Sequence, residues 1–315
     1  MSVFSSPFKE PFHNPFGSPF NDPGIGGGGP SLTPVEQVQA IFQVPGTEGF
    51  FWDPSVLGNM SSSVYTQIQD AAVNGVVGLL LDNLPDSTLG PNIAPGGGTF
   101  TGGYTGWTLG GVWQYSGNQI STIIGASPDY AVANSVVLES GAFYAVDFDT
   151  NSNDNVNYAM VYGGPYSAAA NNNGGLRVRK YILGANTSYM SFRGVAPSAS
   201  VYVDNVETRK MPGHPAMQNA AGKRPALKKT GSVYWLDFDG VDDAMFTVFK
   251  TSLGTNVTIA RSIPGVGASI LTGQTISAGT WTDSTDHSGL IMVNRSLTAP
   301  ELAAVTALLN ARAGV

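Results

Sequence analysis

Apolar and polar residues alternate along much of the chain between residues 107 and 210, in short runs separated by glycine, asparagine and proline. Alternation with a period of two is typical of strands that bury one face. The runs are GWTLGGVWQYS, SVVLESGAFYAVDFDT, NYAMVYGG, GLRVRKYILG, SYMSFRG and ASVYVDNVETR. Many short strands with turn residues between them predict an antiparallel β-sandwich or jelly roll.

Strand-like segments also flank this region. Before it come the aromatic segment GFFW and a short apolar run from Val76 to Leu81, which predict one or two buried strands. After it, Met211-Pro212-Gly213 breaks the pattern, and an alanine- and lysine-rich segment follows in which we expect no strand. Strands resume after Ser232 with VYWLDFDG, AMFTVFK, NVTIARSI, ASILTGQ, TWTDS and GLIMVN. A second antiparallel β region is therefore predicted.

The C-terminus has a helical pattern instead. Thr298 and Glu301 have the spacing of a capping box, and Gly314 is placed to end the helix. The buried face would hold Leu302, Val305, Leu308 and Leu309.

A shorter helix is predicted after residue 33. Thr33 would be its N-cap, followed by Pro34 and by Glu36 at the third position, and Pro45 would stop it. The apolar side of this helix holds Val35, Val38, Ile41 and Phe42. Such a segment could pack subunits of a fibre together or act as a simple linker helix.

The composition excludes several classes of protein. Only 12% of the 315 residues are charged, against ~25% in ordinary domains, and the net charge is −7, which argues against a nucleic-acid binder that tracks phosphates. The chain has no cysteine, so neither disulfides nor thiolate metal sites are expected. No apolar run is long enough for membrane insertion, and the N-terminus does not have the pattern of a secretory signal.

The N-terminus carries four Pro-Phe pairs, one every four residues, before a run of four glycines from Gly26 to Gly29. Proline prevents this stretch from forming a helix interior or a central strand, so we expect an extended path. The phenylalanines are Phe8, Phe12, Phe16 and Phe20. Because they have no core of their own, they are expected to dock on another protein as an anchor. A tail without a partner is the alternative.

Part of the chain resembles a known domain type. The segments FFWDPSVLG, QDAAVNGVVGLLLDN, HPAMQNAAGKRPAL, YWLDFDGVDD and GLIMVNRSLTAPELAAVTALLNARAGV resemble a concanavalin-like (laminin-G-like) domain that is frequent in phage and prophage structural proteins. The long piece between the second and third of these segments is similar to a jelly-roll carbohydrate-binding module, with its GWT near the start and a DNV strand at its end. The outer domain is short for a full concanavalin-like sandwich.

The resemblance implies a domain order. We expect a Pro-Phe anchor and glycine linker at 1–33, and a short helix or linker at 34–46. A discontinuous lectin-like domain follows at 47–89 and 211–315, with a jelly-roll domain inserted at 90–210. The predicted fold is mainly β, with antiparallel β-sandwich or jelly-roll domains, an extended N-terminal anchor and a short C-terminal helix.

The Pro-Phe segment is similar to the N-terminal anchors of tail fibres in siphophages and in gene transfer agents of alphaproteobacteria. This resemblance implies a virion tail fibre that is extracellular in the mature particle. It would attach by its N-terminus to the baseplate, the tail or another virion protein, and would bind host surface polysaccharide, as a homotrimer. A head decoration or neck fibre with a structural role, or a glycan depolymerase, are the alternatives.

Sugar recognition needs flat apolar rings and amide or carboxylate groups on a rigid scaffold. The predicted inserted domain offers both, and the candidate residues are Trp107, Trp113, Tyr115, Tyr162 and Asn171. The alternative is that the aromatic residues belong to the core and that the asparagines belong to turns.

Two acidic segments are candidates for metal binding. Asp147, Asp149 and Asn151 place oxygen atoms at every second residue, as at the start of a calcium loop, but the glycine and the glutamate of an EF-hand are missing. A looser structural calcium site or an Asx-rich turn are the two interpretations. In LDFDGVDD, from residue 236 to 243, a turn is expected. No other cofactor is predicted.

Catalysis is not expected. The three histidines, His13, His214 and His287, are far apart in sequence, which gives a histidine-based site little to draw on. Neither a β-helix repeat nor a phosphate-binding glycine loop is present.

Overall fold

The computed structural model describes residues 32–62, 72–84, 89–123, 129–134, 136–151, 159–162, 167–170, 177–183, 190–194 and 200–315. The Pro-Phe segment with Phe8, Phe12, Phe16 and Phe20 lies outside the described residues. The described part is mainly β, with several antiparallel sheets and two α-helices, one of them short and C-terminal. The predicted fold class is confirmed in these respects.

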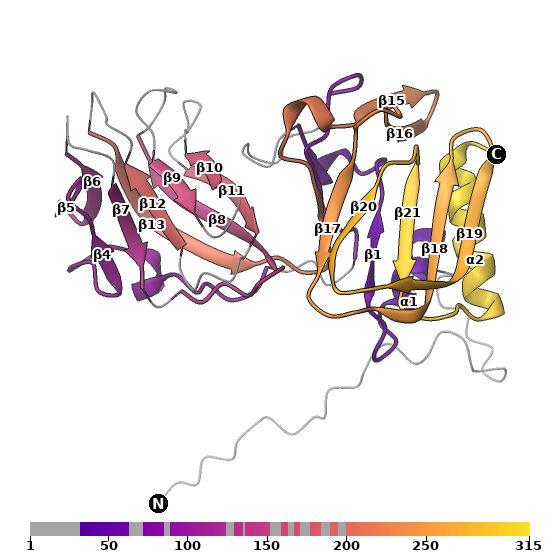
Figure 1. The fold of residues 1–315 in the computed structure, drawn as a ribbon, viewed down its shortest axis with the longest axis horizontal. Coiled ribbons are helices and arrows are strands. Elements are labelled where there is room, and N and C mark those ends of the chain that lie inside the picture. Colours follow the sequence, from indigo (N-terminus) through magenta and orange to yellow (C-terminus); the bar gives the residue numbers. More distant parts are fainter. Residues whose placement is uncertain are drawn as a thin grey trace, which may run out of the picture.

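Two sheets at one end of the molecule form what we call the outer sandwich (Figure 1). The first has the order β1-β21-β18-β19, and the second β2-β3-β14-β17-β20. The bounds are β1 Gly49–Trp52, β2 Met60–Ser61, β3 Leu79–Leu80, β14 Ala216–Met217, β17 Met245–Phe249, β18 Gly254–Ile263, β19 Gly267–Ile276, β20 Gly279–Asp283 and β21 Gly289–Val293. Strands from both ends of the chain therefore share each sheet.

Alternation along β1 and β21 produces three layers. Phe50 and Trp52 point into the core between the two sheets. Phe51 points to the opposite face, where it packs with Ile291 and Val293 against the helices. Because both faces of β1 and β21 are covered, these strands are continuous apolar runs in the sequence.

The two helices cover the free face of the first sheet. They are α1, Pro34–Ile41, and α2, Ala299–Ala313, and each begins with the predicted capping box. In α2 the residues Val305, Leu308 and Leu309 are buried, whereas Leu302 is 39% exposed and does not belong to the predicted buried face. Since α1 packs in the same apolar cluster as α2, its apolar side is covered by its own chain.

Two further sheets form what we call the inserted sandwich (Figure 1). Their orders are β10-β9-β12-β7-β4 and β11-β8-β13-β6-β5. The bounds are β4 Trp107–Leu109, β5 Trp113–Ser116, β6 Gln119–Thr122, β7 Asp129–Ala133, β8 Phe143–Thr150, β9 Ala159–Tyr162, β10 Ser167–Ala170, β11 Arg177–Leu183, β12 Met190–Gly194 and β13 Tyr202–Lys210. All of these strands fall within the segment 90–210.

The segment that follows residue 213 differs from its prediction. It contains β14 and also β15, Ala226–Thr230, which pairs with β16, Val233–Asp237, in a two-stranded sheet. The lysines at 228 and 229 obscured this strand in the sequence, because most positions of the β15-β16 sheet are only half-buried and do not need an alternating apolar face.

The two sandwiches meet where the chain leaves the outer one and returns to it. Leu79 and Leu80 pair with Met217 and Ala216. Beyond this pair, the Asp82 carboxylate accepts the backbone N–H groups of Phe51 and His214, both at 2.9 Å. A buried apolar cluster then joins the two bodies: Leu79, Met211 and Met217 with Phe143 and Ala145 of β8. The joint is therefore built from both chain crossings.

Two groups at this joint have displaced pKa values. Burial raises the pKa of Asp82 to about 7, although the backbone N–H groups of His214 and Phe51 partly offset it. Burial also lowers the pKa of His214 to about 4. Between pH 4 and 6.5 the folded chain holds the Asp82 proton more tightly than the unfolded chain, and holds a His214 proton less tightly. As the pH rises, Asp82 lowers the stability and His214 raises it, so the two effects oppose each other.

Replacing His214 should expose the contribution of Asp82. We expect the stability of His214→Gln relative to the wild type to improve by roughly 2 kcal/mol when the pH falls from 7 to 4.5. In this range the wild-type imidazole gains a proton in the unfolded state but not in the folded state, where it is buried, and the variant has no imidazole at this position. Urea unfolding at both pH values measures this difference. Parallel pH profiles of the two proteins would contradict the expectation.

A glycine pair tests the packing of the inserted sandwich. Gly97 and Gly98 both have positive φ, 71° and 88°. A Cβ on Gly98 would lie 1.5 Å from the Val206 carbonyl oxygen of β13, whereas a Cβ on Gly97 would meet nothing within 4 Å. We expect Gly97→Ala to cost about 1 kcal/mol for its backbone conformation, and Gly98→Ala about 3 kcal/mol or more. Denaturant unfolding measures the free energy of unfolding of both variants. Equal losses of stability would show that the backbone of β13 moves away from residue 98 at little cost.

Candidate functional site

The outer face of the β10-β9-β12-β7-β4 sheet carries an exposed aromatic ring. On β7, Ala131 and Ala133 point into the core, so Tyr130 and Val132 point outward. Val132 pairs with Thr108 of β4, and Tyr130 pairs with Arg193 of β12. Strand register thus places these four outward side chains on three adjacent strands. We call this set, together with Asp129, the Tyr130 face.

A cavity of about 300 Å³ opens on the Tyr130 face, lined by Thr108, Gly110, Asp129, Tyr130 and Val132. Tyr130 is 39% exposed, and the Arg193 guanidinium carbon lies 5.9 Å from the centre of the Tyr130 ring. The Asp129 carboxylate accepts the N–H groups of Gly111, at 2.6 Å, and of Tyr130, at 2.8 Å.

These hydrogen bonds of Asp129 fix the shape of the cavity. A Cβ on Gly110 would lie 2.4 Å from the Asp129 carboxylate, so this side chain and the backbone of Gly110 are in close contact. At the rim, the Asn134 amide donates to the Thr108 hydroxyl at 2.6 Å. A partly exposed ring, a hydroxyl, an amide and a carboxylate on a rigid sheet are the groups that bind the C–H face and the hydroxyls of a sugar.

A second aromatic surface lies on β5. Tyr104, which is 44% exposed, packs against Tyr115 with ring centres 5.6 Å apart. The Tyr115 hydroxyl donates to the Asn118 side chain at 3.1 Å. Among the nominated residues whose side chains the structure describes, Tyr115 is the one in a partly exposed aromatic pair.

The two nominated tryptophans lie in the core of the inserted sandwich, as in the alternative interpretation. Trp107 is 5% exposed and stacks on Phe192, with Phe100 also in contact. Trp113 is 4% exposed, and its indole N–H donates to the Asp129 carbonyl at 3.2 Å. Their rings offer little surface to a ligand, but Trp113 supports the strand that carries Tyr130. Tyr162 ends β9 and its side chain lies outside the described residues, as does the whole of Asn171.

The nominated calcium ligands have protein partners. Asp147 forms a two-bond ion pair with Arg179, at 2.7 and 2.8 Å. Asp149 accepts the Asn205 amide, and the Asn151 side chain bonds the backbone of Ser200 and Tyr202. A calcium ion would have to displace these bonds, so the trio does not fit an ion in this arrangement.

In the other acidic segment, Asp239, Asp242 and Asp243 bring their carboxylates within 4.8 Å of one another. Asp239 accepts the N–H groups of residues 241 to 243, which lowers its pKa. This is the hydrogen-bonded turn that the sequence predicts.

The two histidines that the structure describes have different surroundings. His287 is fully buried in the outer sandwich, 3.3 Å from Asp283, and His214 lies at the joint. His13 lies outside the described residues.

Sequence reasoning missed Tyr130 and Tyr104. The signal for Tyr130 was present in DYAVA, where Tyr130 and Val132 alternate with two alanines, but a short strand of small residues was not recognised. Tyr104 lies in a glycine-rich loop with no periodic pattern, and only the fold brings it to Tyr115.

Within the described residues, neither helix is long and apolar enough to cross a membrane. No family model matches the chain, and no curated protein matches it.

Proposed function

We propose that this protein is a non-catalytic adhesin of a virion or gene-transfer particle, a tail fibre that binds host surface polysaccharide and attaches to the particle through its Pro-Phe segment. The observation that carries the proposal is the Tyr130 face, which sets an exposed ring among hydroxyl, amide and carboxylate groups on a rigid sheet. One such site binds weakly, and several copies on one particle would make the attachment strong. A homotrimer, extracellular in the mature particle, would provide these several copies of the site.

The arrangement of the chain supports separate places for attachment to the particle and for glycan binding. The Pro-Phe segment leads into α1, which packs on the outer sandwich. Strands β4, β5 and β6 lie at the end of the inserted sandwich that is farthest from the outer sandwich (Figure 1). A particle attached through the N-terminus would therefore present Tyr115 of β5 and the cavity beside Thr108 of β4 away from the attachment point. A structural head or neck fibre and a glycan depolymerase are the competing functions.

The Tyr130 face can be tested with two substitutions at one position. Tyr130→Ala should weaken the binding of purified protein to extracted host polysaccharide about tenfold, because the stacking surface is lost. Tyr130→Phe keeps the ring and should bind as the wild type does. Binding is measured by titration of the intact chain, with released sugars assayed in the same samples.

Each other outcome of this titration points to one of the competing functions. If Tyr130→Ala and Tyr104→Ala both bind like the wild type, the aromatic surfaces are not the glycan sites. Absence of binding by the wild type would favour a structural role, and release of sugars would make the protein a depolymerase.

The anchor is tested separately. Deleting residues 1–30 should leave a soluble, folded protein that no longer joins particles, because the four phenylalanines are gone. A full-length variant with serine at positions 8, 12, 16 and 20 separates their loss from the change in length. Quantitative detection of the protein in purified particles gives the result, and incorporation of either variant at the wild-type level would overturn the anchor proposal.

A further inference from the structure

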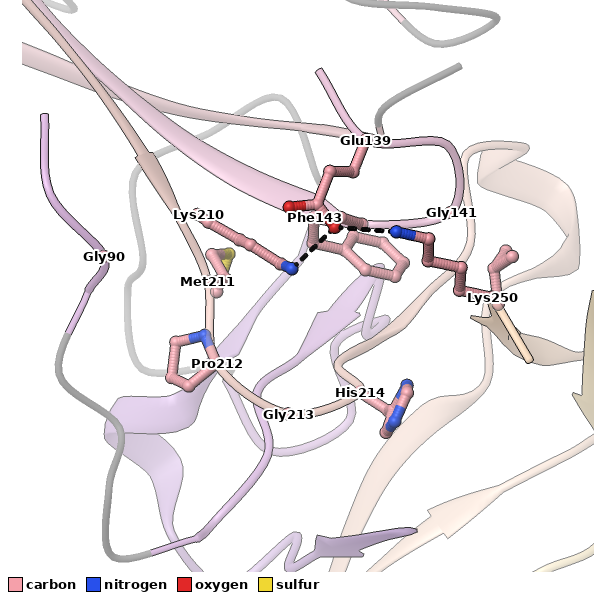
Figure 2. Close-up of a pocket in the computed structure, with 12 residues that line it drawn as sticks. Gly90, Glu139, Gly141, Phe143, Lys210, Met211, Pro212, Gly213, His214 and Lys250 are labelled. Atoms are coloured by element: carbon pink, nitrogen blue, oxygen red, sulfur yellow. Dashed lines mark hydrogen bonds and ion pairs between the residues drawn. The ribbon is translucent and has the colours of Figure 1, made fainter. Parts of the chain in front are cut away.

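A cavity of about 440 Å³ lies where the two sandwiches meet (Figure 2). Its lining comes from both bodies. Phe143 and Lys210 belong to β8 and β13 of the inserted sandwich, whereas Val248 and Lys250 come from β17 of the outer sandwich and the residue after it. His214 lies on the return crossing between them. Ligand sites often form at such joints between domains.

The rim of this cavity is cationic. The ammonium groups of Lys210 and Lys250 approach the same Glu139 oxygen, at 2.9 and 3.2 Å (Figure 2). Two positive charges facing one carboxylate leave a net charge of +1 in a chain whose net charge is −7. An ammonium has three N–H donors, and each of these contacts uses one. The rim can therefore donate further hydrogen bonds to an anion.

The wall beneath the rim is apolar. Pro212 and Val248 are among its partly exposed apolar side chains. Phe143 and Met211, 2% and 7% exposed, belong to the buried cluster of the joint, against which Val248 packs. His214 adds a polar ring that is uncharged at neutral pH, since burial lowers its pKa to about 4. The cavity thus combines an apolar wall with a positive rim.

The shape of the cavity is set before any ligand arrives. Gly213 has φ of +66°, and a Cβ there would lie 2.3 Å from the Asp82 carboxylate. Asp82 accepts the next backbone N–H, that of His214, so the return crossing is held against the outer sandwich. Across the cavity, a Cβ on Gly141 would lie 2.9 Å from Val248. A cavity held in this way loses little entropy when a ligand binds.

We propose that this joint cavity is a second binding site, for a small sugar acid whose carboxylate bridges Lys210 and Lys250 while its ring lies against Pro212 and Val248. This goes beyond the adhesin function, because the cavity shares no residue with the Tyr130 face. A carboxylate beside two ammonium groups forms charge-assisted hydrogen bonds. The apolar wall selects a ligand with a ring over a bare anion.

Calorimetric titration of the intact chain with glucuronate, glucose and acetate, at low ionic strength, tests the proposal. Glucuronate should bind saturably, and glucose and acetate should each bind at least about fivefold more weakly, since one lacks the charge and the other the ring. No binding of glucuronate, equal binding of glucose, or equal binding of acetate would overturn the proposal.

Variants locate the site. Lys250→Gln should weaken glucuronate binding about fivefold, since it removes one exposed charge and leaves the pair of Lys210 with Glu139 in place. The matched control is Lys228→Gln, which removes an equal charge on β15, where Lys228 lies 3.8 Å from Asp237. If both variants weaken glucuronate binding equally, the loss comes from the change in net charge and not from the joint cavity, and the proposed site is overturned.

The same titration separates the two proposals. Tyr130→Ala should leave glucuronate binding unchanged, whether or not it weakens the binding of polysaccharide. A loss of glucuronate binding in Tyr130→Ala would place the ligand on the Tyr130 face and overturn the joint site. Thermal unfolding of each variant shows that the fold is intact.

Discussion

The contact on which the rest of the structure depends is the one between the Asp82 carboxylate and the two chain crossings. Asp82 is 7% exposed and accepts N–H groups from Phe51 in β1 and from His214 in the returning chain. A buried carboxylate that is not hydrogen-bonded would be very costly, so these partners hold the crossings together. With the exit and the return side by side, more than a hundred residues can form a separate sandwich without disturbing the outer sheets.

The same constraint explains how two separate parts of the chain build the two outer sheets. These sheets take β1, β2 and β3 from the N-terminal side of the insertion, and every other strand from its C-terminal side. The C-terminal helix then adds a third layer. Arg312 of α2 pairs with the buried Asp53 just after β1, and Arg295 pairs with Glu301 at the start of the helix, which lowers the Glu301 pKa to about 2. The Arg312 pair thereby fixes α2 to the chain just after β1.

The function proposed here follows from where this arrangement leaves polar and aromatic groups. Most aromatic residues of the inserted sandwich whose side chains are described are used in its core, where Phe148, Phe192 and Trp107 pack together. The rings that remain available to a ligand are those whose strand register turns them outward, such as Tyr130, or that lie beyond the strand ends, such as Tyr104. The joint cavity adds a different chemistry, since its charges come from both sandwiches.

The sequence by itself determined the local structure: the alternating strands, the capping boxes at Thr33 and Thr298 and the glycine that ends α2 at residue 314 are all readable, because they depend on neighbours a few residues away. It also indicated the β-sandwich class. Only the tertiary structure decided which face of a strand is inside. Trp113 and Tyr130 are both aromatic residues on short strands, yet one is buried and the other is exposed, and this depends on partners that are distant in sequence. The joint cavity was unreadable for the same reason, since Glu139, Lys210 and Lys250 meet only after both sandwiches have formed.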